Sequence, residues 1–216
     1  MGTAFGQGAV VFVNQAASDI YTNATQDIWG GAGPATSALT PTVANGGSYF
    51  YALLMQSYSG SGPTASTSLS SLAASGWLST GLFATPGLGA GRLAGGSPVT
   101  TLSADPIGAG NQFTVLGWSG NVAPGTLAGL ATVEANLALG PSYNWTLTGA
   151  PNTLGFVGIS SVGTGVGATL PTESLFNAAG GITGFINLYV VPVPEPATFA
   201  LVGLGGLALL AFRRRN

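Results

Sequence analysis

The chain has 216 residues, of which four are Lys or Arg and six are Asp or Glu, with no Cys and no His. So few cations cannot neutralise phosphate groups, which excludes nucleic acid as a natural partner. The missing Cys and His exclude disulfides, thiol nucleophiles, thiolate metal sites and a histidine base for a serine nucleophile. A hydrophobic fraction of 46% favours a packed core over a disordered chain, and the length suits one domain.

Short apolar runs bounded by Gly, Pro and Asn predict β-strands along the body of the chain. The first covers residues 9–13, and the second covers 48–56 after the turn residues 45–47. The other predicted strands cover residues 77–84, 91–94, 99–102, 112–118, 154–160 and 182–191. This spacing predicts an all-β domain, either a sandwich or a jelly-roll-like barrel.

One segment, residues 126–139, has helical spacing instead. Its apolar side chains recur every three or four positions, at Leu127, Leu130, Val133 and Leu137. This pattern predicts one short helix, which Gly140 and Pro141 should end. We expect the helix to pack across an open end of the sandwich. Residues 57–71, rich in Ser, Thr and Gly, are expected to form a surface loop.

Two acids near the N-terminus give a weak candidate for a metal site. Asp19 and Asp27 flank residues 21–25. Together with Asn14 and Asn23 they could supply oxygen ligands for Ca²⁺, but the spacing matches no EF-hand loop. A solvated turn is the favoured interpretation, and no metal site is predicted.

Three further acids, Asp105, Glu134 and Glu173, lie far apart in the sequence. They could converge as the carboxylate pair that glycoside hydrolysis requires. No local pattern supports this pair. The glycine-rich segments 87–91 and 163–167 lack the dinucleotide-binding fingerprint and are interpreted as turns or strand bends. We therefore expect no catalytic residues, no cofactor and no enzyme activity.

Aromatic side chains give one candidate binding surface. Trp77 and Trp118 lie inside apolar strand runs and are expected in the core. Trp29, beside two glycines, and Trp145, close to Tyr143, are better candidates for exposure. Because exposed aromatic faces suit the apolar side of sugar rings, these three are candidate glycan contacts. Core or loop packing is the alternative, and we favour it.

The C-terminal residues combine a proline motif, an uncharged apolar run and an arginine cluster. The motif consists of Pro194, Glu195 and Pro196, and the apolar run covers residues 197–212. As a helix, this run would span about 24 Å, which is short of the bilayer's hydrocarbon core of about 30 Å. It could cross a membrane only marginally, with bilayer thinning or help from its flanks.

The arginine cluster predicts the orientation of this segment. It consists of Arg213, Arg214 and Arg215. Positively charged flanks stay in the cytoplasm, which places the proline motif on the outer side, near the membrane surface. The two prolines favour an extended backbone there, which a membrane-embedded protease could grip.

Together these features resemble the PEP-CTERM sorting signal of exported proteins in Gram-negative bacteria. The resemblance covers residues 193–216 and no more of the chain. It implies that the membrane protease exosortase cuts near Pro194–Pro196, after a transient stage in the inner membrane held by residues 197–212. The mature protein would then reach the cell envelope, the outer surface or the extracellular matrix. An ordinary single-pass anchor with a proline linker is the alternative.

The N-terminal residues resemble the end of a secretory signal. Ala4 and Gly6 fit the small-x-small pattern of a cleavage site, with Gln7 as the first mature residue. We interpret residues 1–6 as a remnant of the cleavage region of a signal that lies upstream. The predicted organisation is then an exported all-β domain at 7–192 and a sorting signal at 193–216.

The sequence therefore predicts a non-enzymatic exported protein. The link of the PEP-CTERM family to biofilm polysaccharide loci implies a structural or adhesive role in association with exopolysaccharide. A lectin-like glycan-binding module is the alternative, and a glycan-active enzyme is less favoured. A lectin requires a concave cluster of exposed aromatics, an enzyme requires two carboxylates roughly 5–10 Å apart, and the structural role requires neither.

Overall fold

A computed structural model describes residues 9–14, 18–30, 40–42, 49–57, 68–69, 72, 74–95, 100–101, 111–149, 154–164, 172–176 and 181–193. These residues form twelve strands and one helix, which confirms the predicted all-β class with one short helix. The predicted C-terminal hydrophobic helix at 197–212 lies outside the described residues. Within the described part of the chain, no helix has the length and hydropathy that a membrane span needs.

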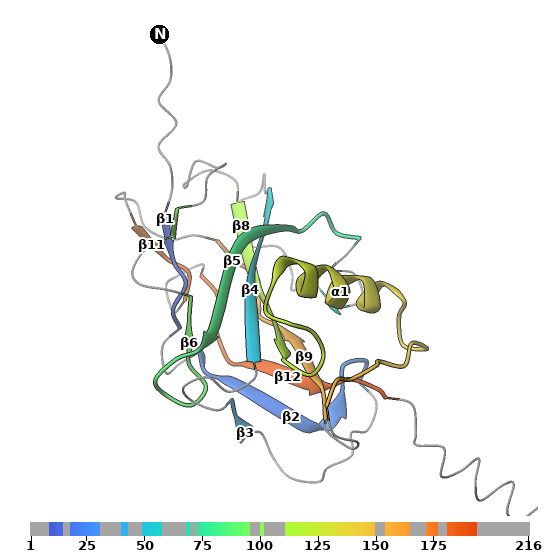
Figure 1. Ribbon diagram of the computed structural model, residues 1–216. Coiled ribbons are helices and arrows are strands. Elements are labelled where there is room, and N and C mark those ends of the chain that lie inside the picture. The colour runs from blue at the N-terminus through green and yellow to red at the C-terminus, as the bar shows by residue number, and fades with distance from the viewer. Residues whose placement is uncertain are drawn as a thin grey trace, which may run out of the picture.

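Most strands belong to one large sheet. They are β2 (Ile20–Asp27), β3 (Thr40–Pro41), β4 (Tyr49–Ser57), β5 (Leu78–Pro86), β6 (Leu93–Ala94), β8 (Asn111–Ser119), β9 (Phe156–Ile159), β10 (Gly163–Thr164) and β12 (Ile186–Val190). Their order is β3-β2-β12-β9-β8-β4-β5-β6, with β10 paired to β8. Strand β12 pairs in parallel with β2 and antiparallel with β9. Figure 1 shows that this sheet is strongly curled.

A smaller sheet lies at one side of the large one (Figure 1). It contains β1 (Ala9–Val11), β7 (Thr100–Thr101) and β11 (Thr172–Ser174), in the order β11-β1-β7. Here too a strand from near each end of the chain pairs in parallel, β1 with β11. The all-β class is thus specified by the sequence, whereas this arrangement of a curled sheet and a small one is a finding of the structure.

The central strands β4 and β8 are buried on both faces. They pair antiparallel along their whole length, from Tyr49 opposite Ser119 to Ser57 opposite Asn111. Alternate side chains enter two separate apolar clusters, one with Ala52, Leu54, Leu116 and Trp118, the other with Tyr51, Leu53, Phe113 and Val115. Burial on both faces explains why these strands appear in the sequence as nearly continuous apolar runs.

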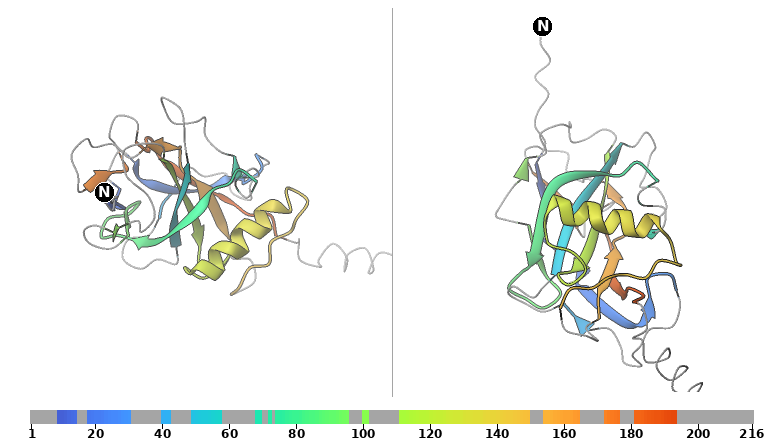
Figure 2. Two further views of the ribbon diagram at one scale, coloured as in Figure 1. Left: turned by 90° about the horizontal axis from the view of Figure 1, so that it is seen from above. Right: turned by 45° about the vertical axis from the view of Figure 1, so that its right-hand side comes forward.

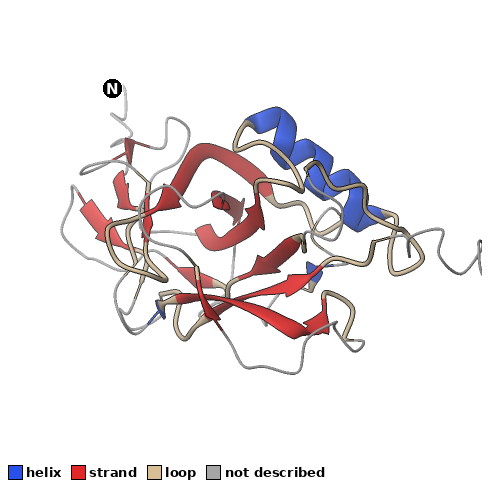
Figure 3. Ribbon diagram, turned by 60° about the horizontal axis from the view of Figure 1, so that its bottom comes forward, coloured by secondary structure: helices blue, strands red, loops and turns tan. Residues whose placement is uncertain are grey.

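Helix α1 (Leu127–Ala138) covers the first of these clusters. Its buried side chains, Leu130, Val133 and Leu137, pack with those of the sheet. The helix begins after Thr126, whose hydroxyl accepts a hydrogen bond from the Gly129 N–H at 3.2 Å. It lies across a face of the sheet, not across an open end as expected (Figures 2 and 3). Leu127, expected on the apolar side, is 61% exposed because it starts the helix beyond the covered face.

The second cluster is closed by residues that flank the small sheet. Phe12 follows β1, and Leu175 and Phe176 follow β11, and all three are buried in this cluster. The rings of Phe12 and Phe176 stack with centroids 6.4 Å apart. The large sheet is therefore covered on one face by a helix and on the other by side chains adjoining the small sheet.

Strand β2 contradicts the sequence prediction of a solvated turn between Asp19 and Asp27. Residues 20–27 form a strand whose first half pairs with both β3 and β12. Its second half bulges, since Tyr189 lies opposite Asn23 whereas the next residue, Val190, lies opposite Asp27. Within the bulge the Asn23 side chain accepts hydrogen bonds from Thr25 N and Oγ1 at 3.0 and 2.6 Å. The turn-like residues thus belong to a bulge inside a strand.

Candidate functional site

The last strand of the domain, β12, is an interior strand. Ile186 pairs with Ile20 of β2 on one side, and Tyr189 pairs with Val157 of β9 on the other. Burial alternates along the strand, and Leu188 is completely buried. The C-terminal segment is therefore part of the sheet until it leaves the domain.

The contacts of this segment end within three residues after β12. Backbone hydrogen bonds hold it as follows: Ile28 N to Val190 O at 3.0 Å, Val191 N to Gly155 O at 2.9 Å, and Trp145 N to Pro192 O at 2.8 Å. Val191 is buried, whereas Val193, the last described residue, is 39% exposed. The last described contacts of the segment are thus those of Val191 and Pro192, and Val193 lies at the surface of the domain.

We call residues 191–193 the exit segment and their position on the domain the exit. The aromatic residues that were candidate glycan contacts lie around it. Trp145 is only 1% exposed and packs in the cluster under α1, so it is not an exposed glycan contact, and the favoured interpretation of core packing applies to it. The physical reason is its backbone bond to Pro192, which places it beneath the exit segment. Tyr143 packs edge-on against Trp145 with centroids 6.1 Å apart. Tyr143 and Trp29 are both half-buried against the same cluster.

The expected core tryptophans are confirmed. Trp77 is 7% exposed and Trp118 is completely buried, both in the cluster under α1. The indole N–H of Trp118 donates to the Ala123 carbonyl at 3.0 Å. The proline motif Pro194–Pro196, the apolar run and Arg213–Arg215 all lie outside the described residues, as does the N-terminal segment 1–6.

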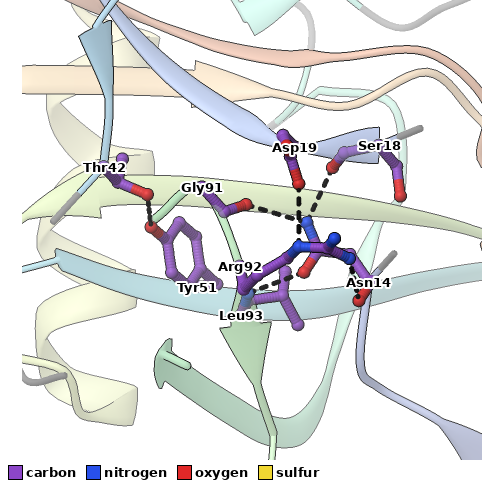
Figure 4. Close-up of polar contacts among 8 residues, drawn as sticks. All are labelled: Asn14, Ser18, Asp19, Thr42, Tyr51, Gly91, Arg92 and Leu93. Atoms are coloured by element: carbon purple, nitrogen blue, oxygen red, sulfur yellow. Dashed lines mark hydrogen bonds and ion pairs between the residues drawn. The ribbon is translucent and has the colours of Figure 1, made fainter. Parts of the chain in front are cut away.

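A polar cluster lies at the opposite end of β2 from the exit (Figure 4). At its centre is Asn14, which is 3% exposed. Its amide nitrogen donates to the carbonyls of Ser18 and Gly91 at 2.7 and 3.0 Å, and its amide oxygen accepts from Leu93 N at 2.7 Å. Asn14 therefore ties its own segment to Ser18 and to residues 91–93, beside the antiparallel bridge between Val13 and Ala94. The sequence analysis considered Asn14 only as a Ca²⁺ ligand, and its structural role was missed.

The same cluster contains the one Lys or Arg of the described residues, Arg92. Its Nε lies 3.0 Å from Oδ1 of Asp19, and it also donates to the Asn14 carbonyl at 3.3 Å. Beside this pair, the hydroxyl of the buried Tyr51 donates to Thr42 Oγ1 at 3.2 Å. Burial raises the pKa of Tyr51 above its ordinary range. The cluster is therefore structural: Asn14, Arg92, Asp19 and Tyr51 are all engaged by neighbouring protein groups.

The candidate Ca²⁺ ligands are not brought together. Asp19 and Asp27 lie at opposite ends of strand β2, so the spacing that suggested a common loop is spanned by extended chain. The carboxylate of Asp27 accepts a hydrogen bond from Trp29 N at 2.8 Å. Among the described residues there is no group of three His, Cys, Asp or Glu side chains that could hold a metal ion.

The three acids considered for glycoside hydrolysis have different standing. Glu134 lies on α1, half-exposed, and burial raises the pKa of its carboxyl. Asp105 lies outside the described residues, and Glu173 is in β11 with its side chain outside the description. The structure therefore describes only one of the three carboxyl groups.

One exposed aromatic pair was not singled out from the sequence. Phe185, directly before β12, is 56% exposed and packs edge-on against Tyr21 of β2, with centroids 5.1 Å apart. Phe185 lies in an apolar run that predicted a strand. Such a run does not indicate which of its rings faces outward. Only the parallel pairing of β12 with β2 brings Tyr21 to it.

Comparison with known proteins gives one match, and it falls on the exit. Residues 192–215 match the PEP-CTERM protein-sorting motif. The chain therefore carries the sorting signal of an exported protein that exosortase processes and that is sorted to the cell envelope or surface. No curated protein and no solved structure matches the chain, so the domain before the motif has no recognised family.

Proposed function

We propose that the domain at residues 7–192 is a non-enzymatic component of the cell envelope or extracellular matrix, structural or adhesive, that associates with exopolysaccharide after exosortase has removed the tail. The observation that carries this proposal is the position of the exit. The described contacts end at Pro192, where the match to the sorting motif begins. Cleavage near Pro194–Pro196 would remove no described strand, so the product retains the whole sheet.

The low charge of the domain supports association with an uncharged polymer. The described charged side chains are Asp19, Asp27, Arg92 and Glu134, and two of them pair with each other. A polar surface with so few charges suits hydroxyl-rich, neutral glycans better than phosphates or strongly charged partners.

A lectin-like module is the second candidate, and the pair of Phe185 and Tyr21 favours it. A half-exposed ring held by a second ring is a suitable platform for the apolar face of a sugar. The test is retention of the purified domain on exopolysaccharide from its host. A specific site predicts that Phe185→Ala abolishes retention while Leu88→Ala, at another exposed apolar residue, leaves it intact. Equal retention of both variants would contradict a lectin site at Phe185.

The experiment that tests the main proposal compares the host with and without exosortase. We expect the intact mass of the protein to end near Pro194–Pro196 in the envelope or medium of the first strain. In the deletion strain, we expect full-length protein in the membrane fraction. Full-length, membrane-bound protein in both strains would make the tail a plain anchor and remove the main support for a matrix role.

A further inference from the structure

The distance between the folded domain and the apolar run is short. Val193 is the last described residue, and the run begins at Ala197. Four fully extended residues span at most about 14 Å. The headgroup layer on each side of a bilayer is roughly 5–8 Å thick, as the difference between about 40–45 Å in total and about 30 Å of hydrocarbon shows. While the run is in the membrane, Val193 can therefore lie at most about 6–9 Å outside the headgroup layer. This step rests on the proposed function, which places the run in the membrane.

The residues around the exit form an apolar surface that we call the exit rim, made of Leu139, Tyr143, Leu154 and Val193. Leu154, Val193 and Leu139 are 37%, 39% and 61% exposed, and Tyr143 is half-buried.

Contacts on three sides connect the exit rim to the exit segment. Leu154 precedes Gly155, whose carbonyl is bonded to Val191 N. Tyr143 contacts Trp145, whose N–H is bonded to Pro192. Leu139 ends α1 and is joined to Tyr143 by a turn in which Tyr143 N donates to Gly140 O at 3.1 Å. Figures 1 and 2 show this end of α1 on the side where β12 ends.

The opposite end of the domain has different chemistry. Strand β2 connects the two ends, because Ile20 N bonds to Gly91 at its start and Ile28 N bonds to Val190 at its end. Eight strand residues span about 26 Å. The ion pair of Asp19 and Arg92 and the exposed Leu88 lie at the start, away from the exit. Two described charges lie toward the exit end, and both are acidic: Asp27, whose carboxylate is held by Trp29 N, and Glu134 of α1, in the helix that leads to Leu139.

We propose that in the uncut precursor the exit rim seats on the lipid headgroup layer of the membrane that holds the apolar run. Leucine, valine and tyrosine suit this contact. Tyr is enriched at membrane–water interfaces, and burial of aliphatic side chains away from water lowers the free energy. No cation of the described residues lies at the rim, so the contact is apolar and depends little on ionic strength. Pro194–Pro196 would then be shielded by the domain on one side and by the membrane on the other. Only a protease embedded in that membrane approaches the motif freely.

The test uses the natural absence of cysteine, which makes single-cysteine labelling unambiguous. Full-length precursors carrying Leu139→Cys, Leu154→Cys, Leu88→Cys or Leu204→Cys are labelled with a small fluorophore and reconstituted into vesicles with nitroxide-labelled headgroups or acyl chains. Leu204 lies in the apolar run and reports its insertion. Leu88, 88% exposed at the far end of β2, is the control for nonspecific contact.

We expect headgroup nitroxides to quench the labels at 139 and 154 at least threefold more than the label at 88, in low and in high salt. Acyl-chain nitroxides should quench the label at 204. A ten-residue Gly-Ser insertion after Val193 should abolish quenching at 139 and 154 while quenching at 204 persists.

Three results would overturn the inference. Quenching at 204 without quenching at 139 and 154 would show an inserted tail and a domain that stands off the lipid, leaving exosortase itself as the contact of the rim. Equal quenching at 88 and 154 would show that the domain has no preferred orientation toward the membrane. Absence of quenching at 204 would contradict the membrane stage of the proposed function as well, so the two failures are distinguishable.

Discussion

Asn14 makes three buried side-chain hydrogen bonds to backbone groups, next to the bridge between Val13 and Ala94. The neighbouring ion pair of Asp19 and Arg92 keeps 20% and 32% of its side chains exposed. Solvent therefore screens the ion pair, whereas the bonds of Asn14 are buried and have no substitute in water. The uncharged residue is the more important of the two for stability.

We predict that Asn14→Ala lowers the free energy of unfolding by about 2 kcal/mol or more, because the Ser18 carbonyl and the Leu93 N–H lose the buried bonds that Asn14 gives them. The Gly91 carbonyl keeps its bond from Ile20 N. Arg92→Met should cost about 1 kcal/mol or less, as for other partly exposed pairs. Urea unfolding of the domain measures both. Similar losses for the two variants would contradict the greater contribution of Asn14.

Tyr51 predicts how stability depends on alkaline pH. Burial raises its pKa in the folded state above the unfolded value of about 10. A raised pKa means that stability is complete below pH 10 and falls as the pH rises beyond it, by about 1.4 kcal/mol at one unit above. Urea unfolding at several pH values from 8 to 11 should show this fall in the native protein and a smaller one in Tyr51→Phe.

Thr42→Val serves as the matched control for Tyr51→Phe. It removes the hydrogen-bond partner of the Tyr51 hydroxyl and keeps the titrating group. We expect lower stability at neutral pH and an unchanged fall above pH 10. A fall of the same size in Tyr51→Phe would assign the alkaline sensitivity to other tyrosines, such as Tyr49, whose pKa burial also raises.

At the scale of single elements, α1 shows how close packing overrides helix propensity. Gly129 lies in its first turn and is buried. A methyl group there would overlap the carbonyl oxygen of Pro124, which belongs to the segment leading into the helix. Only glycine permits this approach, although it is a poor helix former.

We therefore predict that Gly129→Ala destabilises the domain by about 1–3 kcal/mol, although the same change in an open helix stabilises it by about 1 kcal/mol. Ala131→Gly, at an exposed position of the same helix, should cost about 1 kcal/mol and calibrates the propensity effect. Thermal unfolding of both variants checks the sign. A higher melting temperature for Gly129→Ala would show that the Pro124 segment moves aside without cost.

Two of the strands that the sequence predicted correctly, β4 and β8, are buried on both faces. Residues 48–56 and 112–118 were recognisable because both faces of β4 and β8 are covered. Strand β2 was missed because its bulge contains Asn, Thr and Gln, which also occur in turns. Strands β3, β10 and β11 contain Thr, Pro, Gly, Glu and Ser and no apolar residue, so no apolar run marks them in the sequence.

The candidate site divides in the same way. Pro194–Pro196 and the segment that follows are recognised by a membrane and a protease as linear chain, so sequence alone reveals them. The burial of Trp145 depends on a hydrogen bond with Pro192, some fifty positions away, and the outward position of Phe185 depends on Tyr21. Such side-chain positions follow from the folded topology and could not be predicted from local sequence.

At the scale of the whole molecule, the position of the exit predicts which truncations fold. A chain that ends at Val193 keeps every described contact, and we expect its melting temperature to match that of the full-length protein in detergent. A chain that ends at Phe185 lacks β12, which leaves β2 and β9 without their shared neighbour, and should not fold. A chain that ends at Val190 loses two backbone hydrogen bonds and should melt between these limits. Cooperative unfolding of the chain ending at Phe185 would show that β12 is dispensable.

The parallel pairing of β12 with β2 also sets an order of events during export. A chain that crosses a membrane from its N-terminus presents β2 early and β12 last, just ahead of the sorting motif. The edge of β2 that pairs with β12 would therefore stay unpaired until the last part of the domain has crossed. Completion of the sheet and arrival of the motif at the membrane coincide in time. If export follows this route, as the proposed function requires, the sheet can close only after residues 186–190 have crossed, and cleavage would release a folded domain.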